Sequence, residues 1–153
     1  MSEKILVLGL GNPLMSDEGI GGFLIEQFLA KKQDYAHVDF LDAGTGGMTL
    51  LTLMENRKKV IIIDCAFMDT DTGTIKRFTP EDVITVKKLM HYSLHEADIL
   101  KVIAMAKQLG QCPEEIIIFG IEPLTVEMNQ QISDVLKEKI EQYFERISLD
   151  LPL

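Results

Sequence analysis

Three short, wholly apolar runs constrain the fold of this chain more than any other feature. They span residues 5–8, 60–63 and 116–119, and each is followed by a glycine or an aspartate. Runs without polar alternation are typical of strands that are buried on both faces, as in parallel sheets covered by helices. The sequence therefore predicts an α/β protein whose sheet is mostly parallel.

Segments with other periodicities separate these runs. We expect helices over 19–32, 48–55, 99–109 and 129–147, and further strands over 37–41 and 74–78. Ser16 is positioned to cap the first helix, and the strand over 74–78 could form a hairpin with the strand before it. The alternation of strands and helices predicts a three-layer α/β/α sandwich around a mixed five-stranded sheet. The sequence contains no repeat or linker, so we expect residues 1–153 to form a single domain.

Charge and hydropathy exclude several classes of partner. The 153 residues carry a formal net charge of −9, which would repel a nucleic-acid backbone, so we expect no nucleic-acid partner. No apolar run approaches the roughly 20 residues of a membrane-spanning helix, so we expect no membrane insertion. The N-terminal residues do not resemble a secretory leader, which predicts a cytoplasmic protein.

Two carboxylates and one imidazole are expected at one edge of this sheet. If the first strand lies between the second and third, the loops after the first and third strands face each other across a crevice. Glu18 lies in the first of these loops, Asp64 follows the third strand, and His95 precedes a helix that begins at the same end. Such a set can bind nickel, zinc or iron and leave coordination positions open.

Each of these residues also has an ordinary structural interpretation. Glu18 could be a helix N-terminal acid, Asp64 could cap a turn, and His95 could be a hydrogen-bonded surface histidine. Cys65 is expected to pack beneath a helix and Cys112 to lie at the far end of the sheet, so the two thiols should not meet.

Several segments resemble, in the same order, the motifs of the nickel–iron hydrogenase maturation endopeptidases. The signature of that family is similar to residues 9–21 (GLGNPLMSDEGIG). Its other motifs are similar to 42–48 (DAGTGGM), 60–66 (VIIIDCA), 93–95 (SLH) and 120–123 (GIEP). The resemblance covers nearly the whole chain, although Ala43 stands where the glycine-rich loop of the family usually has a glycine.

The resemblance implies a phosphorylase/hydrolase-like fold and an endopeptidase activity. The substrate would be a hydrogenase large-subunit precursor, which loses a C-terminal extension after it has received nickel. By position, Glu18, Asp64 and His95 match the residues that contact this nickel and carry catalysis. The substrate-binding loop would comprise Asp42, Gly44, Thr45 and Gly46. Because the precursor supplies the nickel, the isolated protein is expected to be able to exist without metal.

Two alternatives remain open at this point. A non-catalytic protein that senses or chaperones the nickel-loaded subunit would use the same residues. The opening Gly9-Leu10-Gly11-Asn12-Pro13 also resembles the start of the peptidyl-tRNA hydrolases, but Leu14 follows where those enzymes have glycine. The acidic composition disfavours a tRNA substrate as well.

Overall fold

The computed structural model describes residues 3–82, 95–129 and 131–152. Its strands are β1 (Ile5–Gly9), β2 (Val38–Asp42), β3 (Lys59–Cys65), β4 (Ile75–Phe78) and β5 (Glu115–Ile121), in the spatial order β2-β1-β3-β5-β4. β1 pairs in parallel with β2 and β3, β3 pairs in parallel with β5, and β4 runs antiparallel to β5. The predicted mixed, mostly parallel sheet is confirmed, with β1 between β2 and β3.

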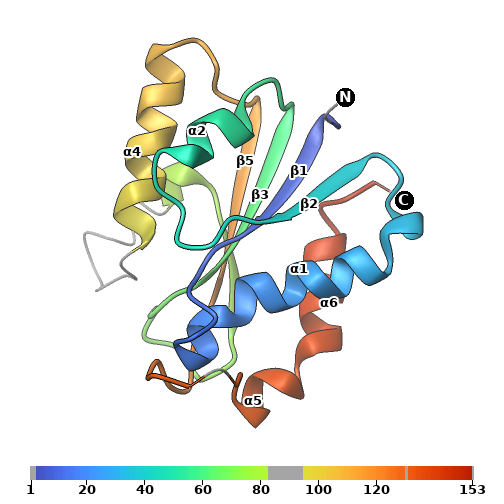
Figure 1. Cartoon of the computed structure of the whole chain (residues 1–153), viewed down its shortest axis with the longest axis vertical. Coiled ribbons are helices and arrows are strands. Elements are labelled where there is room, and N and C mark those ends of the chain that lie inside the picture. Colours follow the sequence, from blue (N-terminus) through green and yellow to red (C-terminus); the bar gives the residue numbers. More distant parts are fainter. Residues whose placement is uncertain (1–2, 83–94, 130, 153) are drawn as a thin grey trace.

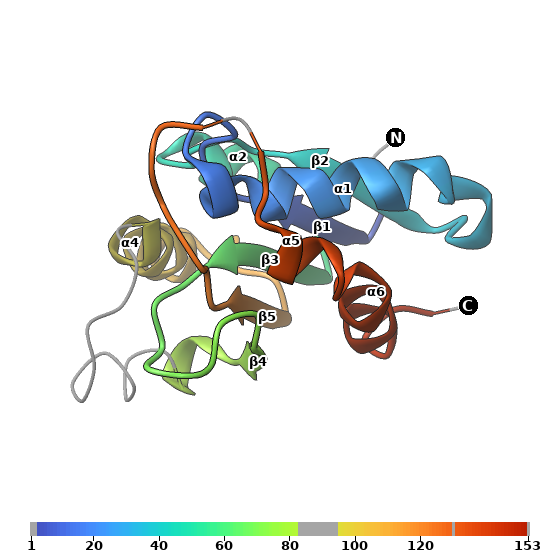
Figure 2. The same ribbon diagram turned by 90° about the horizontal axis from the view of Figure 1, so that it is seen from below.

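Helices cover both faces of this sheet (Figures 1 and 2). The helical segments are η1 (Ser16–Gly19), α1 (Ile20–Ala30), η2 (Lys32–Asp34), α2 (Thr49–Met54), α4 (His95–Gln108), α5 (Asp134–Lys137) and α6 (Ile140–Ser148). Helices α1, α5 and α6 pack against one face, and α2 and α4 pack against the other. The predicted three layers are therefore present. Within the described ranges, no helix combines the length and apolarity needed to cross a bilayer.

Successive side chains of β3 enter different cores because strand side chains alternate between faces. Ile61, Ile63 and Cys65 join the core under α1 and α6, whereas Val60 and Ile62 join the core under α2 and α4. Cys65 thus packs beneath a helix, as predicted. The same alternation places Asp64 on the face covered by α2 and α4.

The predicted hairpin between β3 and β4 is wrong, because β5 lies between them. β3 and β5 are apolar along most of their length, so each is stabilised by a neighbour on both sides and by helices on both faces. β4 exposes Lys76 and Arg77 at its centre, and a strand of this kind is suited to the edge of a sheet.

Two further expectations about helices are also wrong. The terminal helix expected over 129–147 is two helices, α5 and α6, and this break allows Leu136 and Tyr143 to reach the same core. Ser16 does not cap α1, since Gly19 occupies the N-cap position without a side-chain hydrogen bond. Ser16 instead forms hydrogen bonds with a distant loop, described below.

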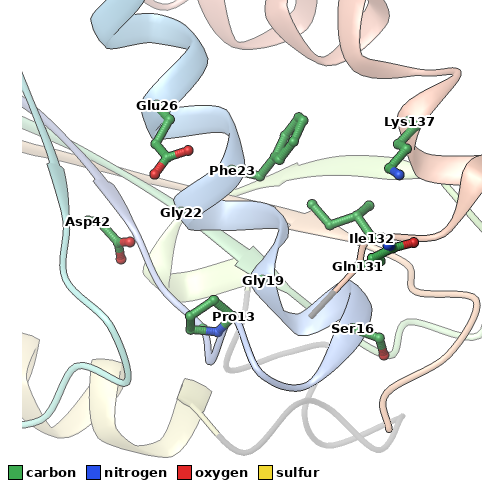
Figure 3. Close-up of a pocket in the computed structure, with 11 residues that line it drawn as sticks. Pro13, Ser16, Gly19, Gly22, Phe23, Glu26, Asp42, Gln131, Ile132 and Lys137 are labelled. Atoms are coloured by element: carbon green, nitrogen blue, oxygen red, sulfur yellow. The ribbon is translucent and has the colours of Figure 1, made fainter. Parts of the chain in front are cut away.

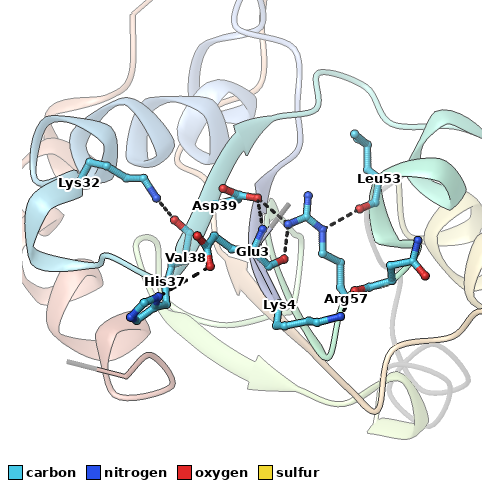
Figure 4. A network of polar contacts seen from close by, with 9 residues as sticks. Glu3, Lys4, Lys32, His37, Val38, Asp39, Leu53 and Arg57 are labelled. Atoms are coloured by element: carbon cyan, nitrogen blue, oxygen red, sulfur yellow. Dashed lines mark hydrogen bonds and ion pairs between the residues drawn. The ribbon is translucent and has the colours of Figure 1, made fainter. Parts of the chain in front are cut away.

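A polar network joins the amino ends of β1 and β2 to the residues that follow α2 (Figure 4). Arg57 donates hydrogen bonds to the Asp39 carboxylate (2.6 Å), to the Glu3 carbonyl (2.6 Å) and to the Leu53 carbonyl (3.2 Å). The Glu3 amide also donates to Asp39, at 3.0 Å. The network fixes the end of the sheet opposite the candidate site.

We expect Asp39→Asn to reduce the loss of stability on acidification. Although partial burial opposes the shift, the hydrogen bond and charge of Arg57 hold the pKa of Asp39 below its ordinary value. The ion pair therefore stabilises the fold above the unfolded-state pKa, and this contribution is lost as the pH falls through the folded-state pKa. Thermal unfolding measured between about pH 5 and pH 2 should show a shallower decline for Asp39→Asn than for wild type. The exposed Asp34→Asn is the matched control, and identical pH profiles for the two variants would contradict the prediction.

Candidate functional site

The turn after β1 is packed tightly onto the carboxyl ends of β1 and β3. The Leu10 amide donates to the Ile63 carbonyl at 2.9 Å. A Cβ atom at Gly21 would lie 2.5 Å from the Leu10 oxygen and 2.7 Å from the Ile63 oxygen, so only glycine allows α1 to begin this close to the sheet. This packing brings η1 into contact with β3.

Glu18 and Asp64 therefore lie at the same edge of the sheet, as the sequence predicted. Glu18 belongs to η1 and is half-buried, and Asp64 is the penultimate residue of β3 and is 2% exposed. Burial, together with the nearby charges of Asp64 and Glu18, raises the pKa of the Cys65 thiol. A raised pKa disfavours the thiolate form of Cys65 and therefore a role for it as a nucleophile.

His95 is the first residue of α4, and its side chain lies outside the described part of the structure. The position of α4 agrees with the prediction, because α4 precedes the parallel strand β5 and so begins at the carboxyl edge of the sheet. It also covers the face toward which Asp64 alternates. Among the described side chains, no group of three His, Cys, Asp or Glu residues is arranged to hold a metal ion. The complete set of Glu18, Asp64 and His95 stays a prediction.

Asp17 is a structural residue that sequence reasoning missed. Its carboxylate is fully buried and accepts hydrogen bonds from the amides of Leu124 (2.8 Å), Thr125 (3.3 Å) and Ser133 (2.7 Å), and from the Ser133 hydroxyl (2.8 Å). The adjacent Ser16 hydroxyl donates to the Thr125 carbonyl at 2.8 Å. Together, Asp17 and Ser16 fasten the loop after β5 to the turn that carries Glu18.

Glu122 has a similar role on the other side of the site. One of its carboxylate oxygens accepts hydrogen bonds from the Met68 amide (2.7 Å), the Thr70 amide (3.2 Å) and the Thr70 hydroxyl (2.9 Å). It thereby anchors the loop that follows Asp64. The only signal in the sequence was the resemblance of residues 120–123 to a family motif.

The predicted substrate-binding loop lies against the turn after β1. The Ala43 amide donates to the Gly9 carbonyl at 2.8 Å, and the Gly11 amide donates to the Gly44 carbonyl at 2.7 Å. Asp42 accepts a hydrogen bond from the Gly44 amide at 3.0 Å. Gly44 and Gly46 have φ values of 59° and 83°, a conformation that favours glycine. Asp42, Gly44, Thr45 and Gly46 are thus at the same edge of the sheet as Glu18.

A cavity of about 330 Å³ opens beside this edge (Figure 3). Its lining comprises Gly11, Pro13, Ser16, Gly19, Gly22, Phe23, Glu26, Asp42, Gln131, Ile132 and Lys137. Asp42 is the only residue of the predicted substrate-binding loop among them. Glu18 and Asp64 do not line the cavity either, but its members Ser16 and Gly19 belong to the same short helix as Glu18. The cavity therefore adjoins the predicted site without containing it.

Exposed apolar side chains occur on the loops around the site. Leu14, Phe67, Leu124 and Met128 are 51%, 49%, 56% and 88% exposed. Two of these loops lie side by side, since the Asn129 amide donates to the Leu14 carbonyl at 2.9 Å. Leu14 and Met128 are thus exposed on adjacent loops, and adjacent exposed apolar side chains are typical of surfaces that bind another protein.

Comparison with known proteins identifies similar chains. Residues 24–149 match the family model described as hydrogenase maturation protease. The chain is 33% identical over 125 residues to the hydrogenase expression/formation protein HupD of Bradyrhizobium diazoefficiens, a match that covers 82% of this chain and 65% of that protein. It is 32% identical over 150 residues to the hydrogenase 2 maturation protease of Escherichia coli, with 94% and 88% covered.

Solved structures agree with these matches. The hydrogenase maturating endopeptidase HybD from E. coli superposes with a TM-score of 0.83 at 28% identity, over 96% of this chain and 91% of that one. This agreement supports the α/β fold class. The matches to four HupD proteins span only 60% to 65% of the length of those relatives.

Proposed function

Because the chain belongs to the hydrogenase maturation protease family, we propose that it is an endopeptidase that removes a C-terminal extension from a nickel–iron hydrogenase large-subunit precursor. The observation that carries this proposal is the family match together with the position of Glu18 and Asp64 at one edge of the sheet. The precursor is the proposed protein partner, and the cytoplasm is the proposed location.

Glu18, Asp64 and His95 are the residues proposed to contact the nickel of the precursor. Carboxylates and imidazole suit divalent metals of this kind, and three protein ligands leave positions for the thiolates of the precursor. The nickel belongs to the substrate in this proposal, so the isolated protein needs no resident metal. When bound, the metal would polarise the scissile carbonyl or activate a water molecule.

The surface around these residues suits a folded protein substrate. The glycines of the 42–47 loop present backbone without bulky side chains, so an extended peptide can approach closely. The exposed Leu14, Phe67, Leu124 and Met128 supply apolar contacts for the body of the large subunit. The formal net charge of −9 again disfavours a nucleic-acid substrate.

The proposal predicts that nickel-loaded precursor is cleaved and nickel-free precursor is not. Purified protein is mixed with each form, and the mass of the precursor C-terminus is followed by mass spectrometry. Loss of the extension from the loaded form alone is the expected result. Binding of the loaded form without any loss of mass would overturn the protease proposal in favour of a nickel-sensing chaperone. Release of tRNA from peptidyl-tRNA would overturn it in favour of a peptidyl-tRNA hydrolase.

A further inference from the structure

The cavity beside the site carries two carboxylates on one side (Figure 3). Asp42 is the last residue of β2, and Glu26 is an exposed residue of α1. Within residues 3–82, 95–129 and 131–152, neither carboxylate forms an ion pair with a Lys, Arg or His side chain. These two charges are therefore available to a ligand.

Gly22 of α1 allows the two carboxylates to lie at one cavity. A Cβ atom at Gly22 would lie 2.7 Å from an Asp42 carboxylate oxygen, so a side chain at this position would displace Asp42. Because position 22 has no side chain, Asp42 lies directly against α1 at Gly22, which is one helical turn before Glu26. A group of positive charge between Asp42 and Glu26 would gain attraction from both.

The remaining walls suit a long side chain with an apolar stem. Phe23, Ile132 and Pro13 provide apolar surface, and Gln131 and Lys137 lie across the cavity from the carboxylates. A volume of about 330 Å³ is within the range of pockets that bind small groups. Arg and Lys side chains match this lining, because their aliphatic stems pack on apolar surface while the charged head group reaches a carboxylate.

We propose that this cavity binds a basic side chain of the protein substrate, with its head group between Asp42 and Glu26. The identity of the substrate as a hydrogenase precursor depends on the function proposed above, but the preference of the cavity for a cation does not. Lys137 on the far side would face the carbonyl groups of the bound segment and repel a second basic residue. Because η1 joins the cavity to Glu18, one bound segment can occupy both places.

Binding of a small probe tests the cavity without any catalysis. N-acetyl-arginine amide is titrated against the ¹⁵N-labelled protein and compared with N-acetyl-citrulline amide, which has the same shape but no charge. We expect the arginine probe to shift the amide signals of Gly22 and Phe23 with a millimolar dissociation constant and the citrulline probe to bind about tenfold more weakly. Glu26→Gln should weaken the arginine probe about tenfold as well, while Glu145→Gln, an exposed control on α6, should leave it unchanged. Equal binding of the two probes, or shifts confined to other parts of the protein, would overturn the proposal.

A second measurement connects the cavity to substrate processing. With nickel-loaded precursor, Glu26→Gln is expected to raise KM about tenfold and to change kcat less than about twofold, because a substrate-binding charge is lost while the reacting groups are intact. An unchanged KM would overturn the cavity proposal and leave the protease intact. Conversely, wild-type protein that binds the arginine probe but cleaves no precursor would overturn the protease and leave the cavity proposal standing.

Discussion

Asp64→Asn is expected to lower the rate of precursor processing by about 10³-fold or more while the chain stays folded. Asparagine keeps the shape of the side chain but removes the charge proposed to contact the nickel of the substrate. Asp64 is the penultimate residue of β3 and is 2% exposed, so the substitution acts at a buried position at the carboxyl edge of the sheet. Rates are measured from the mass of the precursor C-terminus, and the melting temperature is recorded for the same samples.

Asp71→Asn provides the control for this experiment. Asp71 is an exposed acid in the connection between β3 and β4, and its replacement removes the same charge a few residues further along the chain. We expect this control to process precursor at close to the wild-type rate. Processing at the wild-type rate by Asp64→Asn would refute the assignment of Asp64 to the active site. A large fall in its melting temperature would instead show that the carboxylate is needed for folding.

Asp17→Ala should reduce the free energy of unfolding by about 3–5 kcal/mol. The wild-type carboxylate is fully buried and accepts four hydrogen bonds, three of them from the backbone amides of Leu124, Thr125 and Ser133. Alanine would leave these three amide groups without their acceptor, and an unsatisfied buried donor costs about 1–3 kcal/mol. Denaturation by urea, followed by circular dichroism, measures the loss.

The matched control for Asp17 is Glu127→Ala. Glu127 is an exposed acid in the loop that Asp17 holds. Its replacement by alanine should change the free energy of unfolding by no more than about 0.5 kcal/mol. If Asp17→Ala unfolded at the same urea concentration as this control, the buried hydrogen bonds would not stabilise the fold as proposed. Because the loop also carries Gln131 and Ile132, a fall in stability should be accompanied by weaker binding of the arginine probe.

The parts of the fold that were predicted correctly depend on local sequence patterns. The apolar runs at 5–8, 60–63 and 116–119 became β1, β3 and β5, and their parallel pairing follows from the helices between them. The position of Glu18 and Asp64 at one edge followed from the same topology. These patterns are local, and few structures other than a buried strand fit them.

The errors concern choices that depend on distant residues. β4 pairs with β5, which follows it by about 40 residues, so nothing near β4 could indicate its partner. Ser16 and Asp17 have the residue types of a helix start, but their hydrogen-bond partners lie more than 100 residues later. Glu26 is an ordinary polar residue of a surface helix until the loop containing Gln131 closes a cavity beside it.

The hydrogen bonds that Asp17 accepts from the loop after β5 also affect the order in which parts of the chain can fold during synthesis. The turn bearing Glu18 is synthesised before its partners at Leu124, Thr125 and Ser133, which lie more than 100 residues later in the chain. A nascent chain therefore cannot fix the turn that carries Glu18 in this way until Ser133 has been synthesised.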